Sequence, residues 1–423
     1  MATGIPKTSF RKAFGPGLMW AAAAIGVSHL VQSTRAGAMA GFGLAGVVLL
    51  ALVLKYPFFE FGPRYAAATG LSLVEGYRRI GRWALWLYLL ITLSTALVVQ
   101  LAVVLFTAFL VKLGFGLGWP IPVVAAALCG LCAALLAAGR FSFLDRVIKL
   151  VMLLLAISTL AAAAITLPRA DLSTFTLWPR SALGGTVPLA FVLALMGWMP
   201  SAIDISVWSS LWTLAKGRAT GERASPEAVL LDFRIGYIGT GVLAFAFLAL
   251  GAALMYGSGQ EFGARGTEFS AQLVDLYTQT LGGWTRPIVF TAVLTTMFST
   301  TLTVIDGFPR AIDRGFRVAF VEPGGTSLYA GTGGAYWGAI VILSGLTVLV
   351  LAVFPGSLTA MVDFATIVSF LTAPVLGYLN LRAVTSDSVP SGLRPGRALV
   401  GLSWIGLVVL SGFAILYLVT RIG

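Results

Sequence analysis

Two short stretches of the chain decide the fold: GVSHL at residues 26–30 and GWMPS at residues 197–201. Each lies in the middle of a long apolar run. Glycine with small polar residues at mid-depth of a membrane helix is typical of a discontinuous helix, whose freed backbone groups line a cavity. Pro200 adds a missing backbone donor and a clash with the preceding turn. Either stretch alone could be a kink or a packing contact. The distance between the two along the chain is therefore the stronger indication.

The sequence around both stretches is that of an integral membrane protein. Apolar residues make up 58% of the chain and charged residues 10%, whereas an average soluble protein has about 25% charged residues. Residues 83–111, 340–354 and 399–419 are long apolar runs, and a helix needs about 20 such residues to cross a bilayer. Because a barrel would show short alternating segments instead, the sequence predicts an all-α polytopic membrane protein.

The positions of the charges predict how the chain is threaded. We expect eleven spans, at residues 14–41, 43–69, 83–111, 121–139, 143–167, 186–215, 229–256, 285–308, 334–355, 358–384 and 399–420. Lysine and arginine concentrate before the first span and after spans two, four, six, eight and ten. Since positively charged loops stay in the cytoplasm, we predict a cytoplasmic N-terminus and an external C-terminus in a cell membrane.

The two interrupted spans, one and six, are five spans apart. This spacing predicts a five-plus-five inverted repeat with the two breaks facing each other near the midplane. The first repeat would cover about 14–167 and the second about 186–384, with an extra helix at about 399–420, all within one transmembrane domain, 1–423. The external segment 257–284 has apolar residues at roughly helical spacing, so we expect a short interfacial helix there.

A substrate site is predicted between the two breaks. Half-helix N-termini near Ser28 and Ser201 would present partial positive charge, and the C-terminal ends would offer free carbonyl oxygens. Such a site can accept a cation on its carbonyls or an anion on its amides. The candidate substrate-binding residues are Gly26, Val27, Ser28, His29, Met199, Pro200, Ser201 and Asp204.

Charged residues inside or close to the spans are the second group of candidates. They are the gate or ion-pair candidates Arg35, Asp306, Arg310 and Asp363, because charges inside a membrane are usually paired or functional. Asp306 and Arg310 have helical spacing, which favours an internal ion pair or a gate. Arg35 could snorkel to the interface, or with His29 it could favour an anionic or zwitterionic substrate.

Two smaller groups receive structural interpretations. In span two, either Lys55 with Glu60 or Glu60 with Arg64 could pair along one face of the helix. Cys129 and Cys132 lie in an apolar run without a histidine nearby, so we interpret them as packing residues.

Several motifs together resemble the NRAMP (natural resistance-associated macrophage protein) family. They are GPG at 15–17, the interrupted stretch at 26–29, RAGA at 35–38, FG at 42–43 and the Met199–Pro200 pair. Members of that family are proton-coupled importers of divalent metals such as manganese and iron. The resemblance covers spans one to ten in order, and it implies a LeuT-type fold with discontinuous helices one and six.

The resemblance also suggests metal ligands. The family's first break reads Asp-Pro-Gly-Asn and corresponds to residues 26–29, which contain no carboxylate. In the sixth helix the family has Met-Pro-His; Met199 and Pro200 match it, and Ser201 replaces the histidine. Met199 and His29 are thereby implied as the metal ligands. The run 93–105 lacks the acidic residues that the family's third helix uses on its proton route.

Three functions remain open on these grounds. The first is an NRAMP-like secondary transporter that moves a cation, with a divalent metal ion favoured. The second is the same fold with a small organic solute held by His29, Arg35 and Ser201. The third is a membrane sensor that transports nothing. We expect no cofactor and no nucleic-acid partner, only the bilayer and an ion or small molecule. An enzyme is not expected, because no nucleophile, base and orienting group occur together.

Overall fold

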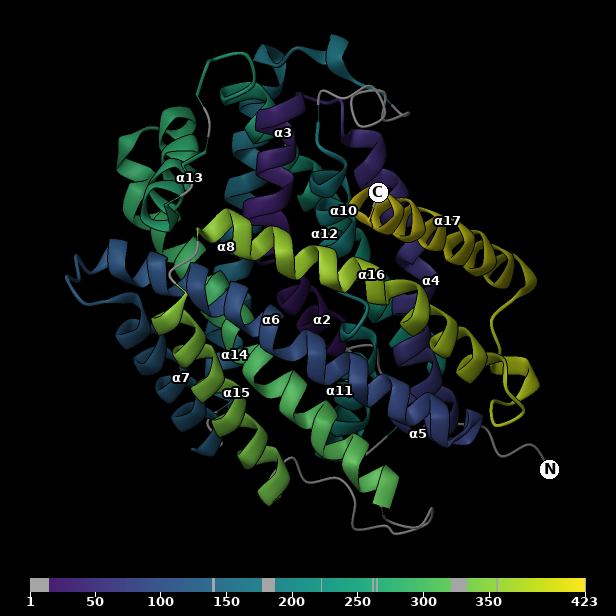
Figure 1. Ribbon diagram of the computed structural model, residues 1–423. Coiled ribbons are helices and arrows are strands. Elements are labelled where there is room, and N and C mark those ends of the chain that lie inside the picture. The colour runs from purple at the N-terminus through teal and green to yellow at the C-terminus, as the bar shows by residue number, and fades with distance from the viewer. Residues whose placement is uncertain are drawn as a thin grey trace.

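The computed structural model describes residues 15–138, 141–176, 187–221, 223–260, 262–263, 265–320, 333–354 and 357–422. Within these ranges every regular element is a helix (Figure 1). The basic residues of the first 14 positions, together with Arg140 and Arg180, lie outside the described residues.

Seven helices of the described chain are long and apolar enough to cross a membrane. They are α4 (Ala45–Thr69), α6 (Arg82–Gly114), α12 (Pro226–Leu254), α14 (Arg286–Phe320), α15 (Gly334–Val353), α16 (Leu358–Thr385) and α17 (Arg397–Ile422). Two more predicted spans correspond to α7 (Ile121–Ala137) and α8 (Phe141–Thr166). Helix α17 lies at the edge of the bundle (Figure 1).

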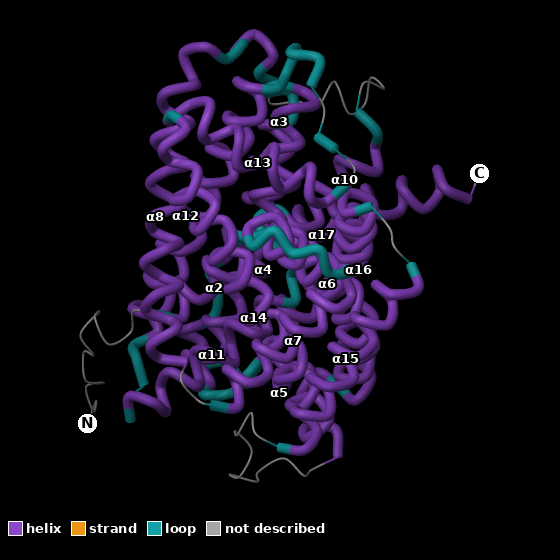
Figure 2. The backbone as a smooth tube through the Cα atoms, turned by 90° about the vertical axis from the view of Figure 1, so that its left-hand side faces the viewer, coloured by secondary structure: helices purple, strands orange, loops and turns teal. Residues whose placement is uncertain are grey.

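The remaining two predicted spans are the interrupted ones. Span one consists of α2 (Pro16–Ala24), the π-helical η1 (Ser28–Ser33) and α3 (Thr34–Ala40). Span six consists of α10 (Leu189–Trp198) and α11 (Ile205–Thr220). In Figures 1 and 2, α3 and α10 lie toward the upper end of the molecule, and α2 and α11 toward the lower end. Both predicted breaks are confirmed, and the two spans run in opposite directions.

Two short helices lie between spans, at opposite ends of the molecule. Helix α13 (Gly266–Leu281) is at the upper end, and it falls in the segment where a helix was predicted (Figures 1 and 2). Its apolar residues, Phe269 and Leu273 among them, are buried against the bundle rather than turned to an interface. Helix α5 (Leu73–Ile80), at the lower end, was not predicted. Its N-terminus is marked by the reciprocal capping pair of Ser72 and Glu75.

Glycines bring span one into close contact with α12. A Cβ atom at Gly37 would lie 2.0 Å from the carbonyl oxygen of Leu248, and one at Gly251 would lie 2.1 Å from that of Thr34. A Cβ at Gly17, near the start of the span, would also collide with the α12 backbone. These contacts need residues without a side chain, and they fix both halves of span one against one helix.

The structure also shows the partners of the charged residues in span two and the state of the two cysteines. Of the alternatives in span two, the structure shows Glu60 paired with Arg64 at 2.6 Å, while Lys55 contacts span six instead. Cys129 and Cys132 are free and buried in α7.

Candidate functional site

The break in span one is held by hydroxyl groups. The Ser28 hydroxyl donates to the carbonyl oxygen of Ala24 at 2.7 Å, which satisfies one of the carbonyls left open where α2 ends. Thr300 of α14 donates to the carbonyl oxygen of Ile25 at 3.4 Å. A Cβ at Gly26 would lie 2.8 Å from the Thr300 hydroxyl. Glycine at this position therefore lets α14 approach the break.

The His29 side chain turns away from the break and toward α12. Its Nδ1 lies 2.7 Å from the Ser28 hydroxyl, and its Nε2 lies 3.0 Å from the carbonyl oxygen of Thr240. Because a carbonyl oxygen only accepts, Nε2 carries a proton and is not available to a metal ion. The imidazole is fully buried. In this conformation it connects span one to span seven.

The break in span six encloses a lysine. Lys55 of α4 is fully buried, and its ammonium donates to the carbonyl oxygens of Met196, Gly197 and Ser201 at 3.0, 2.9 and 2.7 Å. The sequence does not predict this contact. The only indication of it in the sequence is a lysine in the middle of an apolar span. Spacing within the helix suggests a pair with Glu60, and it cannot identify a partner on another helix.

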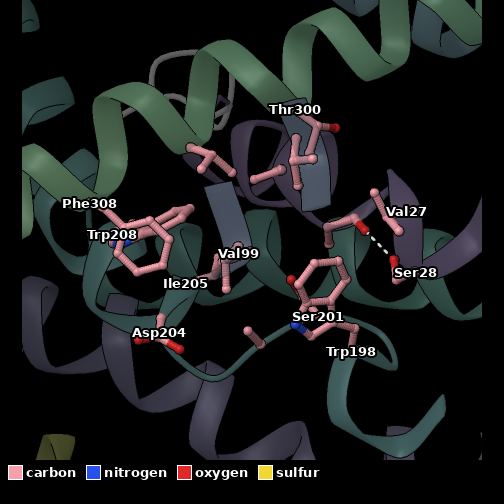
Figure 3. Close-up of a pocket in the computed structure, with 15 residues that line it drawn as sticks. Val27, Ser28, Val99, Trp198, Ser201, Asp204, Ile205, Trp208, Thr300 and Phe308 are labelled. Carbon is pink, nitrogen blue, oxygen red and sulfur yellow. Dashed lines mark hydrogen bonds between the residues drawn. The ribbon is translucent and has the colours of Figure 1, made fainter. Parts of the chain in front are cut away.

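A small cavity of about 30 Å³ lies between the two breaks (Figure 3). Four of the predicted substrate-binding residues line it: Val27, Ser28, Ser201 and Asp204. The other wall residues include Trp198, Ala202, Val99, Trp208, Thr300 and Phe308. The remaining predicted residues, Gly26, His29, Met199 and Pro200, are not part of the lining. The structure therefore brings together half of the expected set.

Asp204 is the charged residue of the cavity wall. It stands at the N-cap of α11, yet its carboxylate makes no capping hydrogen bond to that helix. Oδ1 accepts a hydrogen bond from the Thr95 hydroxyl at 3.2 Å. Oδ2 is buried and has no hydrogen-bond partner within the described ranges. Figure 3 shows Asp204 on the same stretch as Ser201, across the cavity from Thr300. One oxygen of a buried carboxylate is thus left for a ligand.

Above the cavity, a polar cluster joins span one to span ten. Arg35 of α3 pairs with both carboxylate oxygens of Asp363 on α16, at 2.7 and 3.1 Å. Gln32 donates to the same carboxylate at 3.0 Å, and the Arg35 guanidinium lies over the ring of Phe191. The sequence named Arg35 and Asp363 separately as gate candidates. The structure shows that they are partners across two spans.

The pair predicted from helical spacing among these candidates, Asp306 and Arg310, is formed within α14 at 2.6 Å. The Tyr336 hydroxyl of α15 donates to the same carboxylate at 2.6 Å. This arrangement fastens α15 to α14. An internal ion pair is present, and a gating role for it stays a prediction.

The described residues contain no group of three or more His, Cys, Asp or Glu side chains arranged to hold a metal ion. A cation in the cavity would therefore be bound by one carboxylate together with hydroxyl groups, carbonyls and water. Such oxygen ligands suit hard cations.

Comparison with solved structures places this architecture among known transporters. A mutant of the manganese transporter of Eremococcus coleocola superposes with a TM-score of 0.71 at 15% identity, covering 100% of this chain and 89% of the other. MhsT in complex with L-phenylalanine gives 0.61 at 14% identity over 97% and 100% of the two chains. Mhp1, a nucleobase-cation-symport-1 family transporter, gives 0.57 at 15% identity over 100% and 96%. The chain thus has the LeuT-type fold that the sequence predicted.

Sequence comparison gives the family. An uncharacterised protein of Pasteurella multocida is 35% identical over 419 residues, which cover 97% of this chain and 93% of that protein. Residues 17–420 match the family described as natural resistance-associated macrophage protein-like. The match includes both broken spans and all the helices around the cavity. The chain therefore belongs to the Nramp family of membrane transporters.

Proposed function

We propose that this protein is a secondary transporter that moves a divalent metal ion across the cell membrane by alternating access, through the cavity between the two broken spans. The observation that supports this most is the unpartnered Oδ2 of Asp204. A buried polar atom without a partner is destabilising, and for a charged group the penalty is larger. A bound cation removes that penalty.

The chemistry of the wall favours a hard cation. Ser28, Ser201 and Thr300, which line the same cavity as Asp204, offer hydroxyl oxygens. Manganese and magnesium prefer such oxygen ligands and keep part of their water. The likeness to a manganese transporter agrees with this cargo. His29 and Met199, which the family resemblance implied as ligands, are outside the lining, and we do not include them in the proposed site.

The size of the cavity argues against the organic solute considered above. A volume of about 30 Å³ has room for one or two waters or a partly dehydrated ion, since about 10–15 Å³ is the minimum for a single water. The side chains expected to hold the solute also point elsewhere. His29 is hydrogen-bonded to the carbonyl oxygen of Thr240 on α12, and Arg35 forms an ion pair with Asp363.

The charge of Lys55 does not cancel that of Asp204 in this proposal. The ammonium is balanced by the carbonyl oxygens of Met196 and Gly197 at the negative end of α10 and by that of Ser201 in the break. Asp204 stands at the positive end of α11, which favours its ionised form. A cation in the cavity can therefore be attracted by the carboxylate.

The orientation belongs to the same proposal. Basic residues gather after spans two and eight. They are Arg78 and Arg79 of α5 and Arg310, Arg314 and Arg317 at the C-terminal end of α14. By the positive-inside rule this end faces the cytoplasm. The N-terminus would be cytoplasmic and the C-terminus external.

The proposal is tested by metal uptake into liposomes containing the purified protein. Manganese and magnesium are supplied under an inward proton gradient and an inside-negative potential. We expect uptake by the native protein and a drop of roughly tenfold or more for Asp204→Asn, because losing an interaction with a charged group is worth at least about 1.5 kcal/mol. The control is Asp275→Asn, which removes a more exposed carboxylate of α13. Absence of uptake by the native protein, or native uptake by Asp204→Asn, would refute the proposal.

A further inference from the structure

The contact between Lys55 and span six has the composition of an ion-binding site. Lys55 comes from the middle of α4, and its ammonium is surrounded by the carbonyl oxygens of Met196, Gly197 and Ser201, all within 3.0 Å. An ammonium has three N–H donors and no acceptor. The three carbonyls therefore satisfy it completely, which is what allows a charge to be buried at this depth.

The position of the three carbonyls in the fold is equally specific. Met196 and Gly197 belong to the last turn of α10, where carbonyl oxygens have no partner within the helix and bear partial negative charge. Ser201 belongs to the segment between the two halves of span six. In transporters with discontinuous helices, carbonyls of these two kinds coordinate a dissolved cation. Here the lysine ammonium occupies the position of that cation.

The surroundings add further attraction for a positive charge. The ring of Phe59 lies 5.6 Å from the ammonium, within the range at which an aromatic face attracts a cation. Three carbonyl oxygens and an aromatic face thus surround the ammonium, from α4, α10 and the break.

We infer that Lys55 is a tethered cation: its ammonium fills a monovalent-cation site formed by the carbonyl oxygens of Met196, Gly197 and Ser201, so that the break in span six is held without a dissolved ion. Removing the ammonium should leave the carbonyls in place and open the site to a free cation. A side chain that served only as a hydrogen-bond brace would leave no such site, and no ion would compensate for its loss.

The test compares thermal unfolding of the purified protein in sodium chloride and in choline chloride at equal ionic strength. The native protein should have the same midpoint in both salts, because its site is already filled. Lys55→Ala should unfold at a lower temperature in choline, and sodium should raise its midpoint in a saturable way, since a ligand that binds only the folded state stabilises it. Methylammonium should act like sodium.

The matched control is Lys112→Ala. Lys112 also donates to a carbonyl oxygen, that of Trp119, but in an exposed position, so this variant should not respond to sodium. A midpoint of Lys55→Ala that is equal in sodium, methylammonium and choline would overturn the inference. A sodium-dependent midpoint of the native protein would do the same.

A second variant covers the case in which Lys55→Ala cannot be purified. Lys55→Gln keeps N–H donors but no charge, so a hydrogen-bonding brace would be restored by it in choline. The tethered cation predicts instead that Lys55→Gln remains less stable than the native protein in choline. Recovery of native stability there would contradict the inference. None of these measurements involves the transported metal, so their outcome is separate from that of the proposed function.

Discussion

At the scale of single residues, a side chain can bind a ligand in the cavity only if its polar atoms are not already hydrogen-bonded to the protein. Among the described residues, Asp204 keeps one carboxylate oxygen without a hydrogen-bond partner, whereas Nε2 of His29 donates its proton to the carbonyl oxygen of Thr240. Met199 is completely buried and does not line the cavity. A residue type that could bind a metal is thus not sufficient. The partners supplied by neighbouring helices decide which groups remain available.

Met199→Leu provides a test of this assignment. The substitution conserves volume, and such changes in a core usually alter stability by less than about 1.5 kcal/mol. Because the sulfur lies outside the cavity wall, we expect manganese and cobalt uptake within about twofold of the native protein, a factor worth under 0.5 kcal/mol. The measurement is concentration-dependent uptake of both metals into liposomes. A selective loss of cobalt uptake would show that the thioether is a ligand after all.

At the scale of helices, span one depends on close contact with α12. Gly251 lies against the backbone of Thr34, while Gly239 on the same helix has open space beside it. Sequence alone does not separate these two glycines. Only the crossing of the two helices does so.

The two glycines form a matched pair of variants. Gly251→Ala should destabilise the protein by about 1–3 kcal/mol, because the added methyl group overpacks a helix contact. Gly239→Ala should be neutral or slightly stabilising, since alanine is the better helix former. Thermal unfolding in detergent measures both. Equal midpoints for the two variants would mean that the contact between span one and α12 is not as close as described.

The cluster of Arg35 and Asp363 connects span one to span ten, and we propose that it is a gate that breaks when the upper side opens. If it closes the upper side, Asp363→Asn should speed the reaction of a membrane-impermeant thiol reagent with Val27→Cys, a reporter in the cavity wall. We expect an increase of several-fold, in line with the roughly 1 kcal/mol of a partly exposed ion pair. Both native cysteines would be replaced by alanine for this measurement.

The control for this measurement is Asp387→Asn, which breaks the exposed pair with Arg394 outside the bundle. It should leave the labelling rate unchanged. An Asp363→Asn rate equal to that of the control would argue against a gate at this position.

At the scale of the whole molecule, the eleven predicted spans would place the two termini on opposite sides of the membrane. Alkaline phosphatase fused after residue 423 should be active in a bacterial host, because it folds only outside the cytoplasm, and a fluorescent protein fused at the same point should stay dark. The loop charges are the physical reason for this orientation. Fluorescence of the C-terminal fusion would invert the proposed topology and place Arg35 on the cytoplasmic side.

More of the architecture than of the site could be predicted from the sequence. Apolar runs and the two interruptions, with Pro200 in the second, report on local physics, and they gave the spans and both breaks. Helix α5 was missed because its basic residues, Arg78 and Arg79, were interpreted as loop charge. The site required contacts between helices far apart in the chain. Lys55 is 141 to 146 residues away from its three acceptors, and no local pattern reports such a pairing.

We propose that the cavity between the broken spans binds a divalent metal through Asp204. Anomalous diffraction from crystals soaked in manganese tests it most directly. We predict a peak between Ser28, Ser201 and Asp204, at about 2.0–2.6 Å from a carboxylate oxygen, as for other hard cations, and its absence in crystals of Asp204→Asn. A cavity without a peak at saturating manganese, or a peak coordinated by His29 and Met199 instead, would contradict the account.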